Sequence, residues 1–184
     1  MEILAEHFLR HTRRVLRFYR AEGGATAVEF ALIGPAFIAT LLAVLQVCVF
    51  LFAQMVIQNA AVEAGRYFLT GQAQSNNWTA SNIITNVCTN TNVSLLFNCS
   101  NMYVVVQNYA AFASASTSAP AMYNGTTPIT TYAFDPGTQG EVMVVQLIYA
   151  WPVITGPLGF NISNLPNNQI QLMGVSAFRV EPYQ

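Results

Sequence analysis

Glu29 is the ionisable side chain whose chemistry is most restricted by its position in this sequence. It immediately precedes an apolar segment that runs from Phe30 to Ala53. A carboxylate beside hydrocarbon is costly unless a cation pairs with it, so such a group at a membrane boundary indicates a functional site. The alternative is a solvated carboxylate at the level of the lipid headgroups, favoured by the helix dipole. Glu29 is therefore a candidate for charge pairing.

The remainder of the chain offers few side chains for catalysis. His7 and His11 are the only histidines, and two histidines without a third ligand rarely form a metal site. Beyond residue 72, serine is abundant, but histidine and lysine are absent, so a hydroxyl nucleophile lacks its usual base. The charged residues of this region are Asp135, Glu141, Arg179 and Glu181. A calcium site built from the three acids is the alternative to solvated acids at turns and strand ends. We expect no catalytic residue, no metal and no cofactor, and we expect that the chain is not an enzyme.

The apolar segment is long enough to cross a bilayer as a helix. No residue from Phe30 to Val62 carries a formal charge. The hydrocarbon core of a bilayer requires about 20 apolar residues in a helix. A helix buried in a soluble protein is rarely apolar over such a length. The sequence therefore predicts one span, at about residues 30–53, in contact with membrane lipid.

The distribution of charge predicts the orientation of this span. Residues 1–24 contain five arginines and three glutamates, a net charge of +2, whereas residues 25–184 contain two arginines and five acids, a net charge of −3. By the positive-inside rule, the basic segment 1–24 stays in the cytoplasm and the rest of the chain beyond the span is exported. No basic patch is predicted outside the membrane, so binding of nucleic acid is not expected.

Three stretches of sequence resemble one known family. The first is Gly24-Ala25-Thr26-Ala27-Val28-Glu29-Phe30-Ala31-Leu32, in which glutamate is the fifth residue after a glycine. The second and third are residues 60–67, which contain Gly65-Arg66-Tyr67, and the end of the chain from Phe178 to Tyr183. Together they resemble the TadE-like pseudopilins of the tight-adherence (Tad/Flp, type IVc) pilus system, which are type IV pilin-like subunits. Phe30 stands where Flp pilins usually have tyrosine, and the middle of the chain matches the family only in pattern.

The resemblance implies a function in pilus assembly. A prepilin peptidase would cut between Gly24 and Ala25, and Glu29 would then pair with an N-terminal amine as subunits associate. The implied protein is a minor pseudopilin that helps to initiate or assemble a Tad pilus. Its implied partners are the prepilin peptidase, other pilins or pseudopilins, and the Tad assembly machinery of the inner membrane. The implied location is the bacterial inner membrane, with a cytoplasmic N-terminus and a periplasmic domain, and entry into the pilus stays open.

The predicted fold is α+β, with a long pilin-like helix that carries a small exported domain. Segment 25–71 is expected to form the helix, with Gly34 and Pro35 as a possible kink because proline removes one backbone hydrogen bond. Segment 72–184 is expected to form the domain. There, residues 76–85 suggest a short helix, and β-branched and aromatic residues predict antiparallel strands at 102–107, 141–149 and 169–180. Residues 114–128 are expected to form a loop.

Cysteine usage agrees with export. Cys48 lies inside the predicted span and is most simply a small apolar residue. Cys88 and Cys99 lie in the domain expected to face an oxidising compartment, where a disulfide between them would close a short loop. We regard this pair as a possible disulfide.

Two other functions stay open. One is an uncleaved bitopic envelope protein whose exported domain binds a ligand, a carbohydrate or a protein partner, with aromatic contacts near Tyr123 and Tyr132. The other is a processed major subunit that polymerises by itself. The length of the chain argues against the second function, because the major pilins of the Flp type are much shorter.

Overall fold

A long helix, α2, is the first element of the computed structural model, which describes residues 24–156 and 159–182. The predicted cytoplasmic segment 1–24 lies outside the described residues except for Gly24. Helix α2 spans Ala25–Leu69 and includes Pro35. It ends where Gly71 adopts a positive φ of 73°, a left-handed conformation that glycine accepts without strain. The predicted long helix is thus confirmed.

Contacts within the chain divide it into two compact units. The first ends at Val44, and its described part is the N-terminal portion of α2. The second, which we call the sheet domain, begins at Leu45 and includes the C-terminal portion of the same helix. Residues 45–69 therefore belong to the core of the domain that follows them. The expected domain had begun only at residue 72.

The sheet domain combines short helices with antiparallel strands. Its helices after α2 are α3 (Gln72–Ser75) and α4 (Ala80–Asn90). Its strands are β1 (Met102–Tyr109), β2 (Tyr123–Asn124), β3 (Thr127–Pro128), β4 (Val142–Pro152) and β5 (Gln169–Arg179). Single 3₁₀ turns occupy Asn92–Leu95, Cys99–Asn101, Phe112–Ser114 and Pro166–Asn168. The mixture of helix and antiparallel sheet confirms the predicted α+β class.

The main sheet has three strands in the order β1-β4-β5, and each neighbouring pair is antiparallel. The central strand β4 pairs along its length, with Leu147 opposite Val104 of β1 and Gly174 of β5. Most residues of β4 are buried, because both faces of this strand are covered. This burial on both faces explains why the sequence of β4 is almost continuously apolar.

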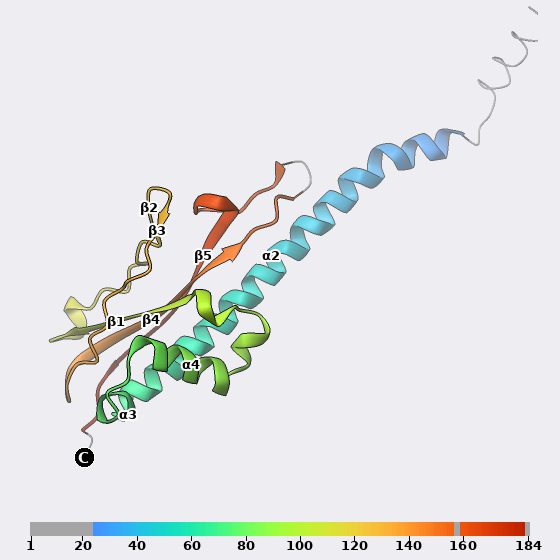
Figure 1. Ribbon diagram of the computed structural model, residues 1–184. Helices are drawn as coiled ribbons and strands as arrows, with labels where there is room; N and C mark the ends of the chain where they lie inside the picture. The colour runs from blue at the N-terminus through green and yellow to red at the C-terminus, as the bar shows by residue number, and fades with distance from the viewer. Residues whose placement is uncertain (1–23, 157–158, 183–184) are drawn as a thin grey trace, which may run out of the picture. The chain divides into compact units, whose positions relative to one another are not determined.

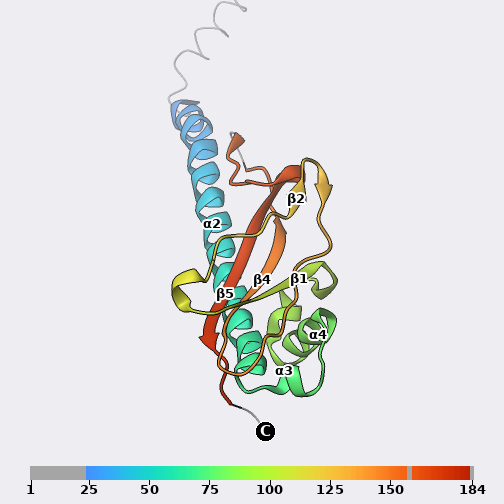
Figure 2. The ribbon, with the colours of Figure 1, turned by 90° about the vertical axis from the view of Figure 1, so that its left-hand side faces the viewer.

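One face of the sheet packs against α2 and α4 (Figures 1 and 2). The contacting side of α2 carries small residues at helical spacing, including Ala53, Ala60, Ala61 and Ala64, each fully buried. Small side chains let the helix and the strand backbone approach closely. Gly174 of β5 shows how close this approach is, because a Cβ atom there would lie 2.8 Å from the Cβ atom of Ala61.

The other face of the sheet is covered by the chain between β1 and β4. Met122 packs there against Val105 and Ile148 in a second, smaller core. Gln146 is buried, and its side-chain amide donates a 3.0 Å hydrogen bond to the carbonyl oxygen of Ser118. The covering segment contains the small hairpin β2–β3, which turns at Gly125 with a positive φ of 62°.

Two local expectations need correction. The short helix expected at residues 76–85 is α4, which begins only at Ala80, because Asn77 adopts a positive φ of 52° and interrupts the helical backbone. The backbone N–H of Thr79, the N-cap, donates to the side-chain oxygen of Asn82. The region expected to be a loop, 114–128, contains the two-residue strands β2 and β3.

Candidate functional site

The residues expected to act in assembly lie at the start of α2. Gly24 directly precedes the helix, and Ala25 is its first residue. Glu29 lies at the fifth position of α2, in the second turn, and is exposed. The helix dipole favours acids most strongly in the first turn, and Glu29 lies beyond that turn.

Apolar side chains surround this carboxylate along the helix. Val28, Phe30, Leu32 and Ile33 are all more than half exposed. The sequence from Gly24 to Val44 contains no lysine, arginine or histidine, so this described part of the first unit provides no cation for Glu29. A charge partner for Glu29 would have to come from outside residues 24–44.

Gly34 and Pro35 lie inside a helix that is continuous from Ala25 to Leu69. A Cβ atom on Gly34 would lie 3.5 Å from the ring of Phe30, an ordinary contact, so crowding does not require glycine here. The kink remains a prediction. Among the described residues, α2 is the one helix long and apolar enough to cross a membrane, with a mean hydropathy of 2.6 over its most apolar window.

The segment with these features matches a known family. Residues 24–66 match the family described as TadE-like protein. This match supports a TadE-like protein of the Tad pilus system. The matched segment begins at Gly24 and ends at Arg66, so it covers most of α2 and none of the strands. No curated protein and no solved structure matches the chain. The function of the sheet domain must therefore be inferred from its own residues.

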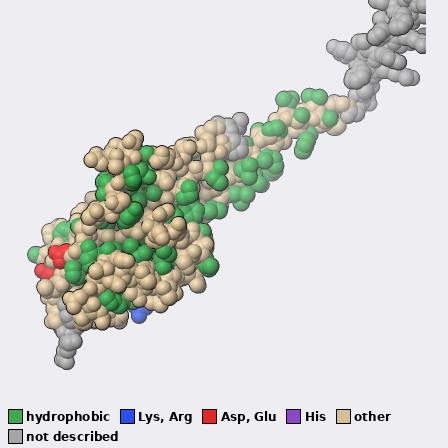
Figure 3. Space-filling view, viewed as in Figure 1, with side chains coloured by type: hydrophobic (Ala, Val, Ile, Leu, Met, Phe, Trp, Pro, Cys, Tyr) green, Lys and Arg blue, Asp and Glu red, His purple; other side chains and the backbone are tan. Residues whose placement is uncertain are grey.

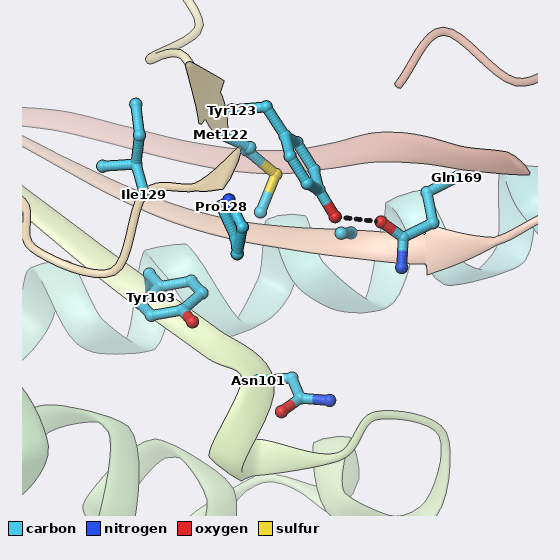
Figure 4. Close-up of a pocket in the computed structure, with 8 residues that line it drawn as sticks. Asn101, Tyr103, Met122, Tyr123, Pro128, Ile129 and Gln169 are labelled. Carbon is cyan, nitrogen blue, oxygen red and sulfur yellow. Dashed lines mark hydrogen bonds between the residues drawn. The ribbon is translucent and has the colours of Figure 1, made fainter. Parts of the chain in front are cut away.

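The sheet domain contains a small pocket beside the covering hairpin (Figure 4). It has a volume of about 150 Å³ and is lined by Asn101, Tyr103, Met122, Tyr123, Pro128, Ile129, Ala150 and Gln169. The hydroxyl of Tyr123 donates a hydrogen bond to the side-chain oxygen of Gln169 across the pocket. The lining contains no acid and no base, so the pocket is suited to binding through aromatic rings and amides.

Tyr132 lies near this pocket without lining it. Its ring packs on that of Tyr103, with 5.3 Å between the ring centroids. Burial, followed by the neighbouring hydroxyls of Tyr103 and Tyr123, raises the pKa of Tyr132 above its usual value. Tyr132 is therefore neutral at physiological pH. Of the two tyrosines expected near a ligand, the structure places only Tyr123 in the pocket wall.

Asp135, Glu141 and Glu181 are not gathered into a metal site in the described part of the chain. Among the described residues, no group of three histidine, cysteine, aspartate or glutamate side chains lies close enough to bind one ion. The carboxylate of Glu141 instead forms hydrogen bonds within the chain. It accepts a 2.7 Å bond from the N–H of Thr138 and a 3.1 Å bond from the side-chain amide of Asn108. These bonds lower the pKa of Glu141.

The disulfide pair lies on the helical side of the sheet. Cys88 in α4 and Cys99 in the 3₁₀ turn before β1 are joined, with 6.5 Å between their Cα atoms. The bond fixes the end of α4 to the start of the sheet. Cys48 is a free cysteine and is exposed on α2.

The sequence analysis missed three glutamines of α2. Gln54 and Gln58 each use their side-chain amide as donor and acceptor for the backbone of β5, at Met173 and Val175. These bonds provide partners for backbone N–H and carbonyl groups on the edge of β5 that does not pair with β4. Gln46 donates a 2.7 Å bond to the carbonyl oxygen of Ile154, in the connection that follows β4. The sequence signal for these contacts was the pair of amide side chains, Gln54 and Gln58, four residues apart on an otherwise apolar helix.

Proposed function

We propose that this TadE-like protein is a minor pseudopilin that takes part in the assembly or initiation of a Tad/Flp pilus. The observation that carries the proposal is the family match beginning at Gly24, with Glu29 exposed among apolar side chains five residues later. Membership of the TadE-like family supports involvement in the Tad pilus, and the apolar helix fits a single-pass membrane protein.

In the proposed mechanism, a prepilin peptidase cuts between Gly24 and Ala25. The new α-amino group has a pKa of about 8 and carries a positive charge near neutral pH. Glu29 pairs with this amine, either its own or that of a neighbouring pilin. Pairing and hydrogen bonding make a carboxylate tolerable in an apolar environment. The helices then associate through their exposed apolar side chains, with the N-terminus cytoplasmic and the sheet domain exported from the inner membrane.

The first test is the N-terminal sequence of the protein from cells with and without the prepilin peptidase. We expect a start at Ala25 only where the peptidase is present. A chain that begins at Met1 in both strains would contradict processing. It would favour the uncleaved envelope protein, for which the aromatic pocket beside Tyr123 is the supporting feature.

A second test separates the charge of Glu29 from its shape. Glu29→Ala and Glu29→Gln should both be cleaved and should both reduce the number of pili, because neither side chain can pair with an amine. Glu63→Ala is the matched control, since Glu63 lies on the same helix but faces Arg66 at 3.4 Å. Normal piliation with Glu29→Gln would contradict the proposed role of the carboxylate charge.

A further inference from the structure

The connection between β4 and β5 lies beside the apolar part of α2. The connection consists of residues 153–168, of which 153–156 and 159–168 are described. Figures 1 and 2 both show it alongside the helix. Its contact with the helix is the hydrogen bond from Gln46 to the carbonyl oxygen of Ile154. Gln46 precedes Ala53, the end of the apolar segment, by seven residues, or about 10 Å of helix.

The connection exposes apolar side chains and carries no formal charge. The side chain of Ile154 is 82% exposed and that of Phe160 is 37% exposed. No formal charge occurs in the sequence between Glu141 and Arg179. An exposed isoleucine and an exposed phenylalanine, at the level of a membrane-spanning segment and without a charge nearby, indicate a surface that contacts apolar material.

The backbone of the connection also meets the demands of a membrane interface. Irregular backbone is tolerated near hydrocarbon only where its polar groups have partners. The carbonyl oxygen of Ile154 is bonded to Gln46, and the N–H of Gly156 donates a 2.7 Å bond to the carbonyl oxygen of Phe160. The N–H of Val153 donates to the carbonyl oxygen of Asn168 at 2.8 Å. Ile154 and Phe160 are the large apolar side chains exposed in the described part of the connection. The polar side chains exposed there are Thr155, Asn161, Asn164, Asn167 and Asn168, which suit the headgroup region.

We propose that this connection inserts Ile154 and Phe160 into the lipid leaflet nearest to the sheet domain. The inference rests on α2 as the membrane span, and it moves that span toward the N-terminus from the predicted residues 30–53. The headgroup region then lies near Gln46. Residues 47–53 lie outside the hydrocarbon, together with the rest of the sheet domain. A span of about 20 residues that ends at Gln46 begins near Ala27. Glu29 then lies two residues, or about 3 Å, inside the boundary of the hydrocarbon, where a charge partner lowers the cost of its carboxylate.

The favoured occupant of this surface is lipid because the loop continues an already apolar membrane segment. Leu45 and Val49 flank Gln46 along α2, and each is about half exposed. Ile154 and Phe160 extend this apolar surface sideways from the helix into the domain. A neighbouring copy of the chain is the alternative occupant, and the experiment below distinguishes it.

The test uses the full chain in vesicles of phosphatidylethanolamine and phosphatidylglycerol, with Cys48→Ser and the native disulfide retained. An environment-sensitive thiol fluorophore is attached in separate variants at Ile154→Cys, Thr155→Cys, Phe112→Cys or Leu41→Cys. Phe112 is the matched control, because it is apolar and 58% exposed. It follows Tyr109, which pairs with Val142 at the end of β4 far from the connection. Leu41 reports on the span itself.

We expect spin-labelled lipids to quench the fluorophore at position 154 several-fold more than at position 112, and aqueous iodide to do the reverse. Thr155 provides a neighbouring exposed position if the Ile154 variant does not fold. A water-exposed label at 154 and 155, with the label at 41 in lipid, overturns the inserted loop but leaves the span. A water-exposed label at 41 overturns the span as well. Shielding at 154 from both quenchers assigns the surface to a protein partner and also overturns the proposal.

Discussion

At the scale of single residues, the sheet domain depends on glycines and amides that permit close packing. Gly174 is the clearest case. A Cβ atom there would contact the backbone carbonyl group of Ile57, and the helix backbone cannot rotate away as a flexible side chain would. The amides of Gln54 and Gln58 lie on either side of this contact and bond the strand at Met173 and Val175. Shape and hydrogen bonding therefore fix β5 to α2 at the same place.

Gly174→Ala should destabilise the sheet domain by about 1–3 kcal/mol, because one added methyl group forces β5 away from α2. Thermal or urea unfolding of the detergent-solubilised chain measures the change. Ala177→Val is the control, since Ala177 lies on the same strand but is exposed, and its substitution should change stability by no more than about 0.5 kcal/mol. Equal effects of the two substitutions would contradict the close contact.

Glu141 should make stability depend on pH in acid. Its pKa is lowered chiefly by the N–H of Thr138 and then by the amide of Asn108. A carboxylate with a lowered folded-state pKa stabilises the fold above its unfolded pKa, about 4.3, and this contribution is lost as pH falls through the folded-state pKa. Glu141→Gln should therefore lower the Tm at pH 7 and have progressively less effect below about pH 4.

A series of melting curves from pH 3 to pH 7 checks this prediction. Glu181→Gln is the comparison, because Glu181 is exposed and its carboxylate has no hydrogen bond or ion pair within the described part of the chain. A Tm difference for Glu141→Gln that does not change with pH would mean that the ionised carboxylate does not contribute.

At the scale of elements, α4 is attached to the sheet by both packing and a covalent bond. Ile83 and Val87 of α4 are buried in the main core. Phe97 follows α4 and packs edge-on against Tyr149 and Trp151 of β4. The disulfide between Cys88 and Cys99 encloses the short segment between these contacts, a segment that contains little regular structure.

Loss of this disulfide, through Cys88→Ser with Cys99→Ser, should lower the free energy of unfolding by about 2–3 kcal/mol. The physical reason is that the open chain has more conformations when unfolded. Cys48→Ser is the matched control, since Cys48 is free and exposed on α2. Unfolding curves with and without a reductant should differ for the Cys48→Ser protein and coincide for the double variant. If reduction leaves the Cys48→Ser curve unchanged, the bond does not stabilise the domain.

At the scale of the whole molecule, charge is concentrated at the N-terminal end of the sequence and sparse beyond residue 29. The face of the described residues in Figure 3 accordingly has only small red and blue areas. Five arginines precede Gly24, and the sequence from Phe30 to Val62 has no formal charge. The sheet domain contains two arginines, Arg66 and Arg179. We therefore expect the arginine cluster before Gly24 to determine the orientation of the proposed span.

Replacement of Arg10, Arg13, Arg14, Arg17 and Arg20 by glutamine should reduce the fraction of molecules whose C-terminus is exported. A C-terminal reporter that is active only outside the cytoplasm measures this fraction. Glutamine at Arg66 and Arg179 is the control and should leave the orientation unchanged, because positive charges beyond the span are few. Unchanged export after the first replacement would contradict the proposed orientation.

The sequence by itself determined the long helix, the α+β class and the positions of three strands. These features depend on local patterns. An uncharged apolar segment must form its own backbone hydrogen bonds, and β-branched runs such as that of β4 favour an extended backbone. The resemblance around Gly24 and Glu29 likewise lies in a short contiguous segment, and the family match covers this same region.

The tertiary structure decided which distant residues meet. Gln46 bonds a carbonyl oxygen 108 positions away, and Gln54 bonds one 119 positions away. The sequence pattern marks these residues only as polar side chains on an apolar helix. Their partners depend on strand order, with β4 between β1 and β5, and on the small alanines that let the sheet approach α2. Because such contacts arise from packing across the whole domain, the position of Ile154 beside the apolar helix became visible only in the folded chain.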